Sequence, residues 1–279
     1  MLLSERTVWP YAYRRGGSPL VVSMPHAGTF IPHSVGAALA DCAACRPDTD
    51  WHLPRLYEGL RELDATVIVA CQSRYVIDAN RPPDGANLYP GQDTPRLCPV
   101  DTFSSEPLYR RGEPDGAEIA RRIDAVWKPY HRRLQRELAR VRALHGVALL
   151  WDAHSIASQV PRLFPGTLPD LNFGTAGGTS CDAGLTRALA AAAARHPGYS
   201  AVFDGRFKGG YITRTYGDPR AGVHAVQLEL SQRTYMQEGS PYSFDPERAG
   251  RLRPLLAELL ETALAWARTR VNPTGPRCV

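Results

Sequence analysis

Two histidines of the chain each follow directly on a run of apolar residues. His154 lies near the end of Val147–Ser155, two residues after Asp152, and His26 follows the shorter run Leu20–Met24. Runs of this length predict buried strands, and open α/β sheets hold their chemistry at the carboxyl ends of such strands. Catalytic zinc commonly takes His ligands and keeps one position open for water. The pair therefore predicts a metal site, with a hydrogen-bonded loop histidine as the alternative for each.

A third ligand has to come from elsewhere in the chain. The compact pattern of a histidine with a carboxylate three residues later is absent, because Thr29 follows His26 at that distance. Asp50 opens a predicted helix and is the best-placed carboxylate, but Asp at that position is also typical of an ordinary N-cap. Asp152 is the reserve ligand, or else the acceptor that orients His154 from the same face of the strand. Two further histidines are weaker alternatives: His33 and His52.

A carboxylate late in the chain is a candidate general base. In the segment Val223–Leu230, Gln227 and Glu229 alternate with apolar residues, which predicts a strand with both side chains on one face. Near a metal-bound water, Glu229 would take a proton and pass it to a leaving amine. The alternative is a solvent-facing residue on an edge strand.

Several cationic and amide side chains could hold an acidic substrate. Asn80 and Arg81 follow the apolar segment Tyr75–Asp78, and Arg74 precedes it. A guanidinium group binds a carboxylate through two parallel hydrogen bonds, and an amide adds neutral donors. Surface arginines without such a role are the alternative. Three residues of a glycine-bearing loop could close over a ligand: Lys208, Tyr211 and Arg214.

Strands and helices alternate along the chain, which predicts an α/β fold in a single domain, residues 1–279, with a mixed central sheet covered by helices on both faces. Predicted strands are Leu20–Met24, Thr66–Cys71, Tyr75–Asp78, Val147–Ser155, Ser200–Phe203 and Val223–Leu230. Predicted helices are Ser34–Ala40, Trp51–Leu63, Ala117–Leu144 with a kink or interruption at Pro129, Asp182–Arg195 and Pro246–Arg268. Segments without periodicity are Pro82–Gly116, expected in the wall of the active site, Ala157–Ser180, Gly205–Gly217 and a frayed end, Asn272–Val279.

Composition narrows the class of protein. A chain of 279 residues with 43% hydrophobic content can bury a full core. The net charge of +5 is modest and suits small anionic molecules, and because acidic residues are interleaved with the basic ones, the charge does not indicate a nucleic-acid partner. No run approaches the ~18 apolar residues of a membrane span and no signal peptide is recognisable, so the cytoplasm is expected. Six cysteines are too sparse for a disulfide framework, and the pair Cys42 and Cys45 is expected to pack as thiols rather than to bind zinc or act in redox chemistry.

Seven short segments together resemble one family, the N-formylglutamate amidohydrolases. In chain order they are Pro25–Gly28, Asp50–Trp51, Asp78–Pro82, Asp152–Ser155, Asp170–Gly174, Gly205–Tyr211 and Gln227–Leu230. The resemblance implies a fold like that of the zinc carboxypeptidases, of phosphorylase/hydrolase-like architecture. It also implies hydrolysis of N-formyl-L-glutamate to formate and L-glutamate in histidine degradation, with Zn²⁺ or another divalent metal as cofactor.

The resemblance also implies roles for matching residues. His26 and His154 would be metal ligands, and Asp50 would replace a glutamate ligand of the wider superfamily. Asn80 and Arg81 would clamp the substrate carboxylate, Arg74 would be an oxyanion donor, and Glu229 the base: these roles follow from the matched motifs. Arg81 would be one of two cationic anchors for a dicarboxylate, with Arg214 or Lys208 as the other.

Two other functions remain open from the sequence. A related zinc deacylase or carboxypeptidase could act on another N-acyl amino acid or a short peptide. From a different class, a basic nucleic-acid-binding module could be built on the helix from Arg110 to Arg142, although this reading leaves the histidines and Glu229 unexplained. The expected partner is a small anionic N-acyl amino acid, without nucleic acid or membrane, and the oligomeric state is not predicted.

Overall fold

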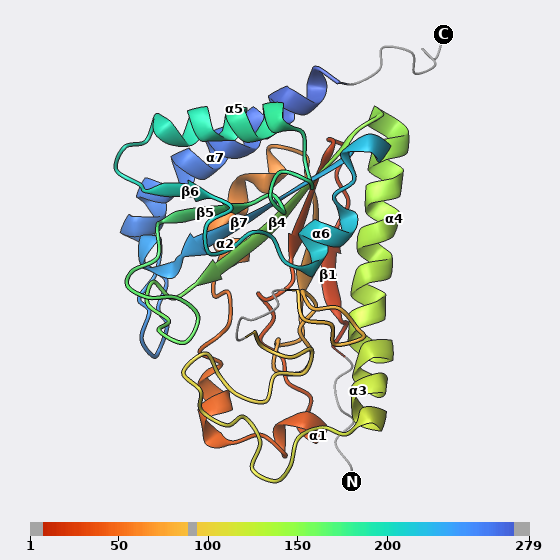
Figure 1. Ribbon diagram of the computed structural model, residues 1–279, viewed down its shortest axis with the longest axis vertical. Helices are drawn as coiled ribbons and strands as arrows, with labels where there is room; N and C mark the ends of the chain where they lie inside the picture. Colours follow the sequence, from red (N-terminus) through yellow and green to blue (C-terminus); the bar gives the residue numbers. More distant parts are fainter. Residues whose placement is uncertain (1–7, 89–93, 271–279) are drawn as a thin grey trace.

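A seven-stranded mixed sheet lies at the centre of the computed structural model, which describes residues 8–88 and 94–270 (Figure 1). The order of its strands is β1-β3-β2-β4-β7-β5-β6. Strands β3, β2, β4 and β7 run parallel, β1 and β5 are antiparallel to their neighbours β3 and β7, and β6 is parallel to β5. The strand bounds are β1 Tyr11–Arg14, β2 Leu20–Met24, β3 Thr66–Ala70, β4 Ala148–Ile156, β5 Leu171–Gly174, β6 Ala201–Phe203 and β7 Val223–Ser231.

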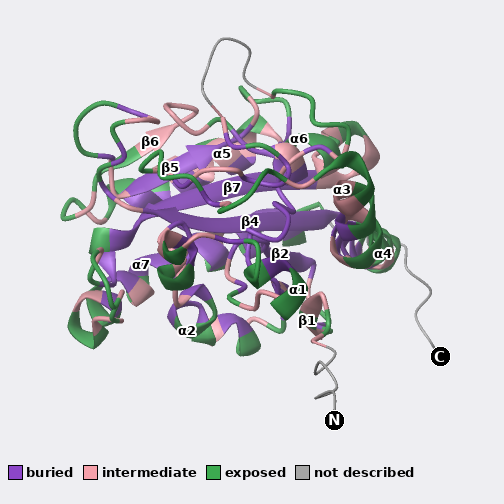
Figure 2. Ribbon diagram, turned by 90° about the horizontal axis from the view of Figure 1, so that it is seen from below, coloured by how far each residue is buried: buried purple, intermediate pink, exposed green. Residues whose placement is uncertain are grey.

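Helices cover both faces of the sheet, as predicted. On one face the strands pack against α7 (Pro246–Arg268) and α2 (Leu53–Leu56), with α5 (Ala183–Ala194) beside α7; Figure 2 shows α7 and α2 on one side of the buried strands. On the other face they pack against α4 (Lys128–His145) and α6 (Tyr211–Tyr216). Successive side chains of a strand point to opposite faces. Strands covered on both sides therefore need the nearly continuous apolar runs from which β2 and β4 were predicted.

The long helix before β4 is interrupted, as Pro129 predicts. α3 (Gly116–Arg122) continues through a π-helical segment, η3 (Ile123–Trp127), into α4, so the change of winding comes just before the proline. A proline inside a helix has no N–H to donate and its ring clashes with the carbonyl four residues earlier, and a π-turn accommodates both.

Two predicted elements are wrong. Trp51–Leu63 is not one helix: α2 is a single turn, followed by the 3₁₀ turn η2 (Glu58–Arg61), because Pro54 fits only a first turn and the backbone of Tyr57 leaves helical geometry (φ −91°, ψ 30°). Tyr75–Asp78 is not a strand but a turn, in which Val76 N donates to Ser73 O (2.9 Å). Its apolar side chains are buried under the loops rather than in the sheet. The apolar run therefore reflects burial and not strand formation.

Five short elements differ from or were missed by the prediction. β1 was not predicted, β5 lies inside the predicted loop Ala157–Ser180, and α6 occupies part of the predicted loop Gly205–Gly217. The first helix, α1 (His33–Gly36), is one turn with Pro32 at its N-cap, and the 3₁₀ turn η1 (Asp41–Cys45) follows. All are too short for a periodic pattern to develop.

The loop segments agree with the prediction where they are described. Residues 82–88 and 94–115 contain no helix or strand and form only isolated bridges such as Asp101 with Pro107. Asn272–Val279 lies outside the described residues. Cys42 and Cys45 are free thiols, and Cys45 is exposed rather than packed. Among the helices of the described ranges, none has the length and apolarity needed to cross a bilayer.

Candidate metal centre and active site

The carboxyl ends of the four parallel strands bring the predicted residues to one edge of the sheet. β4 and β7 pair in register so that Asp152 lies opposite Gln227 and His154 opposite Glu229. Side chains alternate between the two faces of a strand, so these four side chains point to the same face of the sheet as Ala148 of β4. This is the face that α4 covers. His26 follows β2, and the segment that follows β3 contains the predicted substrate residues. Residues far apart in the sequence thus converge because parallel strands end at the same edge.

His26, Asp50 and His154 form a buried group that could hold a metal ion. One nitrogen or oxygen of each lies within 4.8 Å of the others. The Nδ1 atoms of both histidines face Asp50 Oδ2, at 3.7 Å from His26 and 3.1 Å from His154. Two imidazoles and a carboxylate are a donor set suited to zinc or a similar divalent cation. The structure thus brings together the three residues that the sequence offered as metal ligands.

Asp50 is not the cap of a helix. The N-cap of α2 is His52, which makes no side-chain capping bond, and the side chain of Asp50 turns to the two histidines instead. Asp50 N donates to His26 O (3.1 Å), which ties the two candidate ligands together through the backbone. His52 bonds Tyr242 O and His33 lies at the start of α1, so both weaker alternatives are outside the group.

Asp78 fixes the orientation of His26, a role that the sequence reasoning missed. His26 Nε2 donates to Asp78 Oδ1 (2.6 Å), and Arg74 Nη2 donates to Asp78 Oδ2 (2.7 Å). Burial opposes the charge of Asp78, but His26 and Arg74 outweigh it and hold the pKa of this carboxyl well below its usual range. The ionised acceptor keeps the proton of His26 on Nε2 and leaves the lone pair of Nδ1 available to a metal ion. The segment Asp78–Pro82, one of those that carry the family resemblance, contains both Asp78 and Asn80, and this segment was the signal that could have pointed to Asp78.

Replacing Asp78 with Asn is expected to weaken metal binding about 10- to 100-fold, the usual effect of removing the acceptor behind a metal-binding histidine. The amide would also set an N–H against Arg74, so one buried cation loses its partner. Competition with a chelator measures the affinity, and thermal unfolding of both proteins is the control for folding. An affinity equal to that of the wild type in a folded Asp78→Asn protein would contradict this role.

Asp152 occupies the corresponding position behind His154. Its Oδ1 lies 3.3 Å from His154 Nε2, the nitrogen turned away from Asp50, and its Oδ2 accepts from Thr213 Oγ1 (3.2 Å). Burial lowers the pKa of His154, but Asp152 and Asp50 outweigh it and raise that pKa well above its usual value. This geometry fits a support for His154 rather than the reserve ligand.

Glu229 is a buried carboxyl in a polar environment. β7 lies between β4 and β5, so Glu229 is not on an edge strand, and Gln227 Nε2 donates to its Oε2 (3.3 Å). Burial, assisted by Asp50, raises the pKa of Glu229 to about 8, while His154 opposes the shift. A carboxyl with a raised pKa beside a candidate metal site is the expected environment of a general base.

One cavity joins this group to the candidate substrate residues. Its wall includes His26, His154 and Glu229 together with three arginines, Arg74, Arg81 and Arg206. Asn80, Thr94, Pro95 and Phe103 also line it, so the long irregular loop forms part of the wall as predicted. Glu229 is the one acidic side chain among the described residues of this wall. The cavity is therefore suited to an anionic ligand.

Three predicted substrate residues do not line the cavity, and Arg206 takes their place. Lys208 and Arg214 are exposed, and Arg214 Nε donates to Gly209 O (2.8 Å). The ring of Tyr211 packs against Trp127, at 5.7 Å between ring centroids. The reason is local: the chain begins α6 at Tyr211, and the cavity is lined by the backbone of Gly210 instead.

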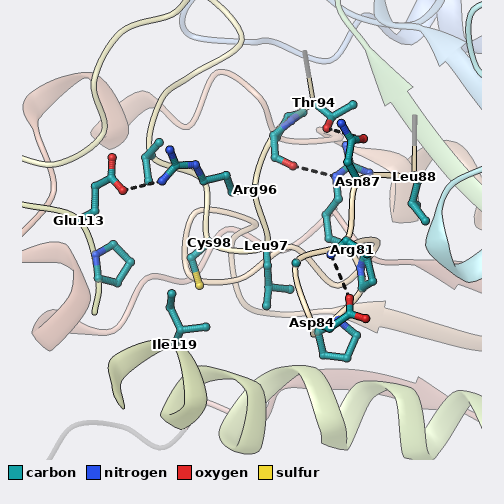
Figure 3. Close-up of a pocket in the computed structure, with 17 residues that line it drawn as sticks. Arg81, Asp84, Asn87, Leu88, Thr94, Arg96, Leu97, Cys98, Glu113 and Ile119 are labelled. Carbon is teal, nitrogen blue, oxygen red and sulfur yellow. Dashed lines mark hydrogen bonds and ion pairs between the residues drawn. The ribbon is translucent and has the colours of Figure 1, made fainter. Parts of the chain in front are cut away.

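A larger cavity of about 440 Å³ lies beside the first and holds none of the candidate ligands. Figure 3 shows Arg81 in its wall together with Asp84, Asn87 and Cys98. The two cavities share Arg81, Thr94 and Pro95. The cavity lined by the two histidines and Glu229 is the candidate active site, although it is the smaller of the two, with about 70 Å³.

Known proteins resemble the chain over most of its length. The model of the N-formylglutamate amidohydrolase family matches residues 18–236. Two curated proteins named N-formylglutamate deformylase are similar over 260 residues, 93% of this chain and 97% of each relative, with 51% identity for Pseudomonas aeruginosa and 48% for Pseudomonas putida.

Solved structures share the fold. The crystal structure of N-formylglutamate amidohydrolase from Ralstonia eutropha is 26% identical, with a TM-score of 0.82 over 95% of this chain and 100% of that chain. A protein from Agrobacterium tumefaciens matches with a TM-score of 0.71 over 93% of this chain and 96% of that chain, but at 20% identity it shows the fold alone. The matched range 18–236 includes every residue of the site described above, and the chain belongs to the N-formylglutamate amidohydrolase family.

Proposed function

We propose that this chain hydrolyses N-formyl-L-glutamate to formate and L-glutamate and that it uses a divalent metal ion, zinc or another, as its cofactor. The observation that carries the proposal is the buried group of His26, Asp50 and His154, whose two histidines line the same cavity as Glu229. The names of the two curated Pseudomonas relatives support the choice of substrate. The family resemblance implies a step of histidine degradation, for which the cytoplasm is the expected compartment.

The metal would be held by Nδ1 of the two histidines and by the carboxylate of Asp50. The donor set and its burial fit such an ion, and Asp78 holds His26 in the required tautomer. A divalent metal in such a site lowers the pKa of water toward neutrality and polarises a carbonyl oxygen.

Glu229 would carry the proton through the reaction. The carboxylate removes a proton from the water whose oxygen adds to the formyl carbon. It then gives this proton to the glutamate nitrogen as the C–N bond breaks, which leaves formate and free glutamate. The guanidinium of Arg74 would offset the negative charge that develops on the formyl oxygen. Arg74 is buried and held by Asp78 and by Asp48 O, so it is already positioned for this role.

Asn80 and Arg81 would bind the α-carboxylate of the substrate. Asn80 Oδ1 accepts from Ile212 N (2.8 Å), which turns its amide Nδ2 toward His154 in the cavity (3.0 Å from Nε2). Arg81 Nε donates to Pro95 O (3.0 Å), and its side chain lines the cavity. Groups already held in place lose less conformational entropy when they bind a ligand.

Steady-state rates on a substrate series test the proposed function. We expect kcat/KM for N-formylglutamate to exceed that for N-acetylglutamate by at least about 10-fold, because a cavity fitted to the small formyl group must exclude an added methyl. N-succinylglutamate and N-formylaspartate should also be poorer substrates. The same protein treated with a chelator is the control for metal dependence. Equal or faster turnover of the acetyl substrate would favour the related deacylase instead.

A further inference from the structure

We propose that Arg206 binds the γ-carboxylate of the substrate and so selects an acidic side chain over a neutral one. This inference rests on the proposed function and extends it to the second charge of N-formylglutamate. Arg206 lines the same cavity as Glu229 and Arg81 but comes from the loop between β6 and α6.

The loop that carries Arg206 is fixed to the sheet at several points. Asp204 N donates to Phe173 O and Gly210 N donates to Gln227 Oε1, both at 2.7 Å. Between these points Gly209 crosses β5 so closely that a Cβ atom on Gly174 would lie 2.4 Å from Gly209 N. The backbone on both sides of Arg206 is therefore held in one position relative to β7, which carries Glu229.

The side chain of Arg206 is positioned as well. Its Nε donates to Leu163 O, and its guanidinium carbon lies 5.6 Å from the centre of the Phe207 ring. Leu163 and Phe207 line the cavity too, and Phe207 makes an edge contact with Phe164 at 6.0 Å. Two loops thus pack together around the guanidinium, which is half-buried at the cavity wall.

The charges of the cavity match a dianion. N-formylglutamate carries an α-carboxylate and a γ-carboxylate, and each is best bound by a guanidinium fork. Three arginines line the wall, and the proposed function assigns Arg74 to the formyl oxygen and Arg81 to the α-carboxylate; Arg206 enters the same wall from a different loop. Lys208 and Arg214, the anchors that the sequence suggested, are exposed and outside this wall. The geometry therefore favours Arg206 for the second carboxylate.

Two substrates that differ only in the γ group isolate this contact. N-formyl-L-glutamate and N-formyl-L-glutamine are compared with the metal-loaded wild type and with Arg206→Gln, whose amide can still donate to Leu163 O. We expect kcat/KM for the glutamate substrate to fall about 10- to 100-fold, mainly through KM, and kcat/KM for the glutamine substrate to change by less than about threefold. The ratio of the two values does not depend on the fraction of folded enzyme.

Matched arginine variants serve as controls. Arg81→Gln should reduce kcat/KM for both substrates and leave the ratio unchanged, since both carry the α-carboxylate. Arg136→Gln, on the exposed side of α4, should change neither value. Arg206→Lys should recover part of the preference for glutamate.

Two outcomes would overturn the inference: an unchanged ratio in Arg206→Gln, or a ratio that shifts in Arg81→Gln, Lys208→Gln or Arg214→Gln but not at Arg206. A wild type that prefers an N-acetyl substrate would contradict the proposed function alone. In that case the ratio between N-acetylglutamate and N-acetylglutamine still tests Arg206.

Discussion

Replacement of Glu229 by Gln should lower kcat for N-formylglutamate about 10²- to 10⁴-fold and leave the metal content unchanged. The amide is nearly isosteric and can keep its contact with Gln227, but it cannot accept the proton of the attacking water. Because Glu229 is not a member of the candidate ligand group, the metal should stay. Steady-state kinetics and metal analysis of the same preparation give the two values.

The pH profile adds a second readout for Glu229. A base acts only when deprotonated, so kcat/KM should fall as the pH falls through its pKa. Burial raises this pKa to about 8, and a dication held by the candidate ligands would stabilise the carboxylate and lower the pKa. The acid limb of the wild type should therefore lie below pH 8. Glu261→Gln, on the exposed side of α7, is the matched control, and substantial activity in Glu229→Gln would exclude the role of base.

The central strands and their polar ends could be predicted because their signals are local. β2 and β4 are buried on both faces and so appear as apolar runs, and the side chains at their ends stand out as exceptions. His26 and His154 were found in this way. The identity of the third ligand was undecided, because a carboxylate before a helical turn is equally suited to capping and to metal binding. Only the turn of Asp50 toward both Nδ1 atoms separates the two alternatives.

The pairing of His154 with Glu229 could not be derived from the sequence alone. It depends on the register of β4 against β7, two strands separated by two helices, two further strands and several loops. β5 remained hidden because its four residues include Asn172 and Gly174, which interrupt an apolar pattern. Both side chains of the pair were suspected, but their proximity is a property of the fold.

The choice among the cations of one loop was also beyond the sequence. Arg206, Lys208 and Arg214 all fall within Gly205–Gly217, which was predicted as one loop, and no periodicity in it tells which side chain faces inward. In the structure, Gly210 N donates to Gln227 and α6 begins at the next residue. The chain therefore turns away from the cavity after Gly209 and Gly210. Arg206, before the pair, is the one left at the cavity.

His26→Ala and His154→Ala should each lose both the metal and the activity. Wild-type protein purified without added metal is expected to hold about one zinc per chain, and removal of one of three protein ligands from such a site leaves too few donors to retain it. His33→Ala, an exposed histidine outside the group, is the matched control and should keep metal and turnover. Elemental analysis with thermal unfolding of each variant separates loss of metal from loss of fold. Unchanged metal content in both ligand variants would refute the site.

The two imidazoles should also make metal binding depend on pH. Burial lowers the pKa of His154, but Asp152 and Asp50 outweigh it and raise this pKa above its usual value; because a metal binds only the neutral imidazole, protons compete with the metal for this ring. Affinity should consequently fall as the pH falls, with release of a proton on binding that calorimetry in buffers of different ionisation enthalpy can count. Asp152→Asn removes one of the two carboxylates that hold this proton and should reduce the proton release.

The His154 and Glu229 variants together separate metal binding from proton transfer. If His154→Ala is inactive and holds no metal, while Glu229→Gln is inactive and still holds it, the histidine binds the metal and the glutamate transfers the proton.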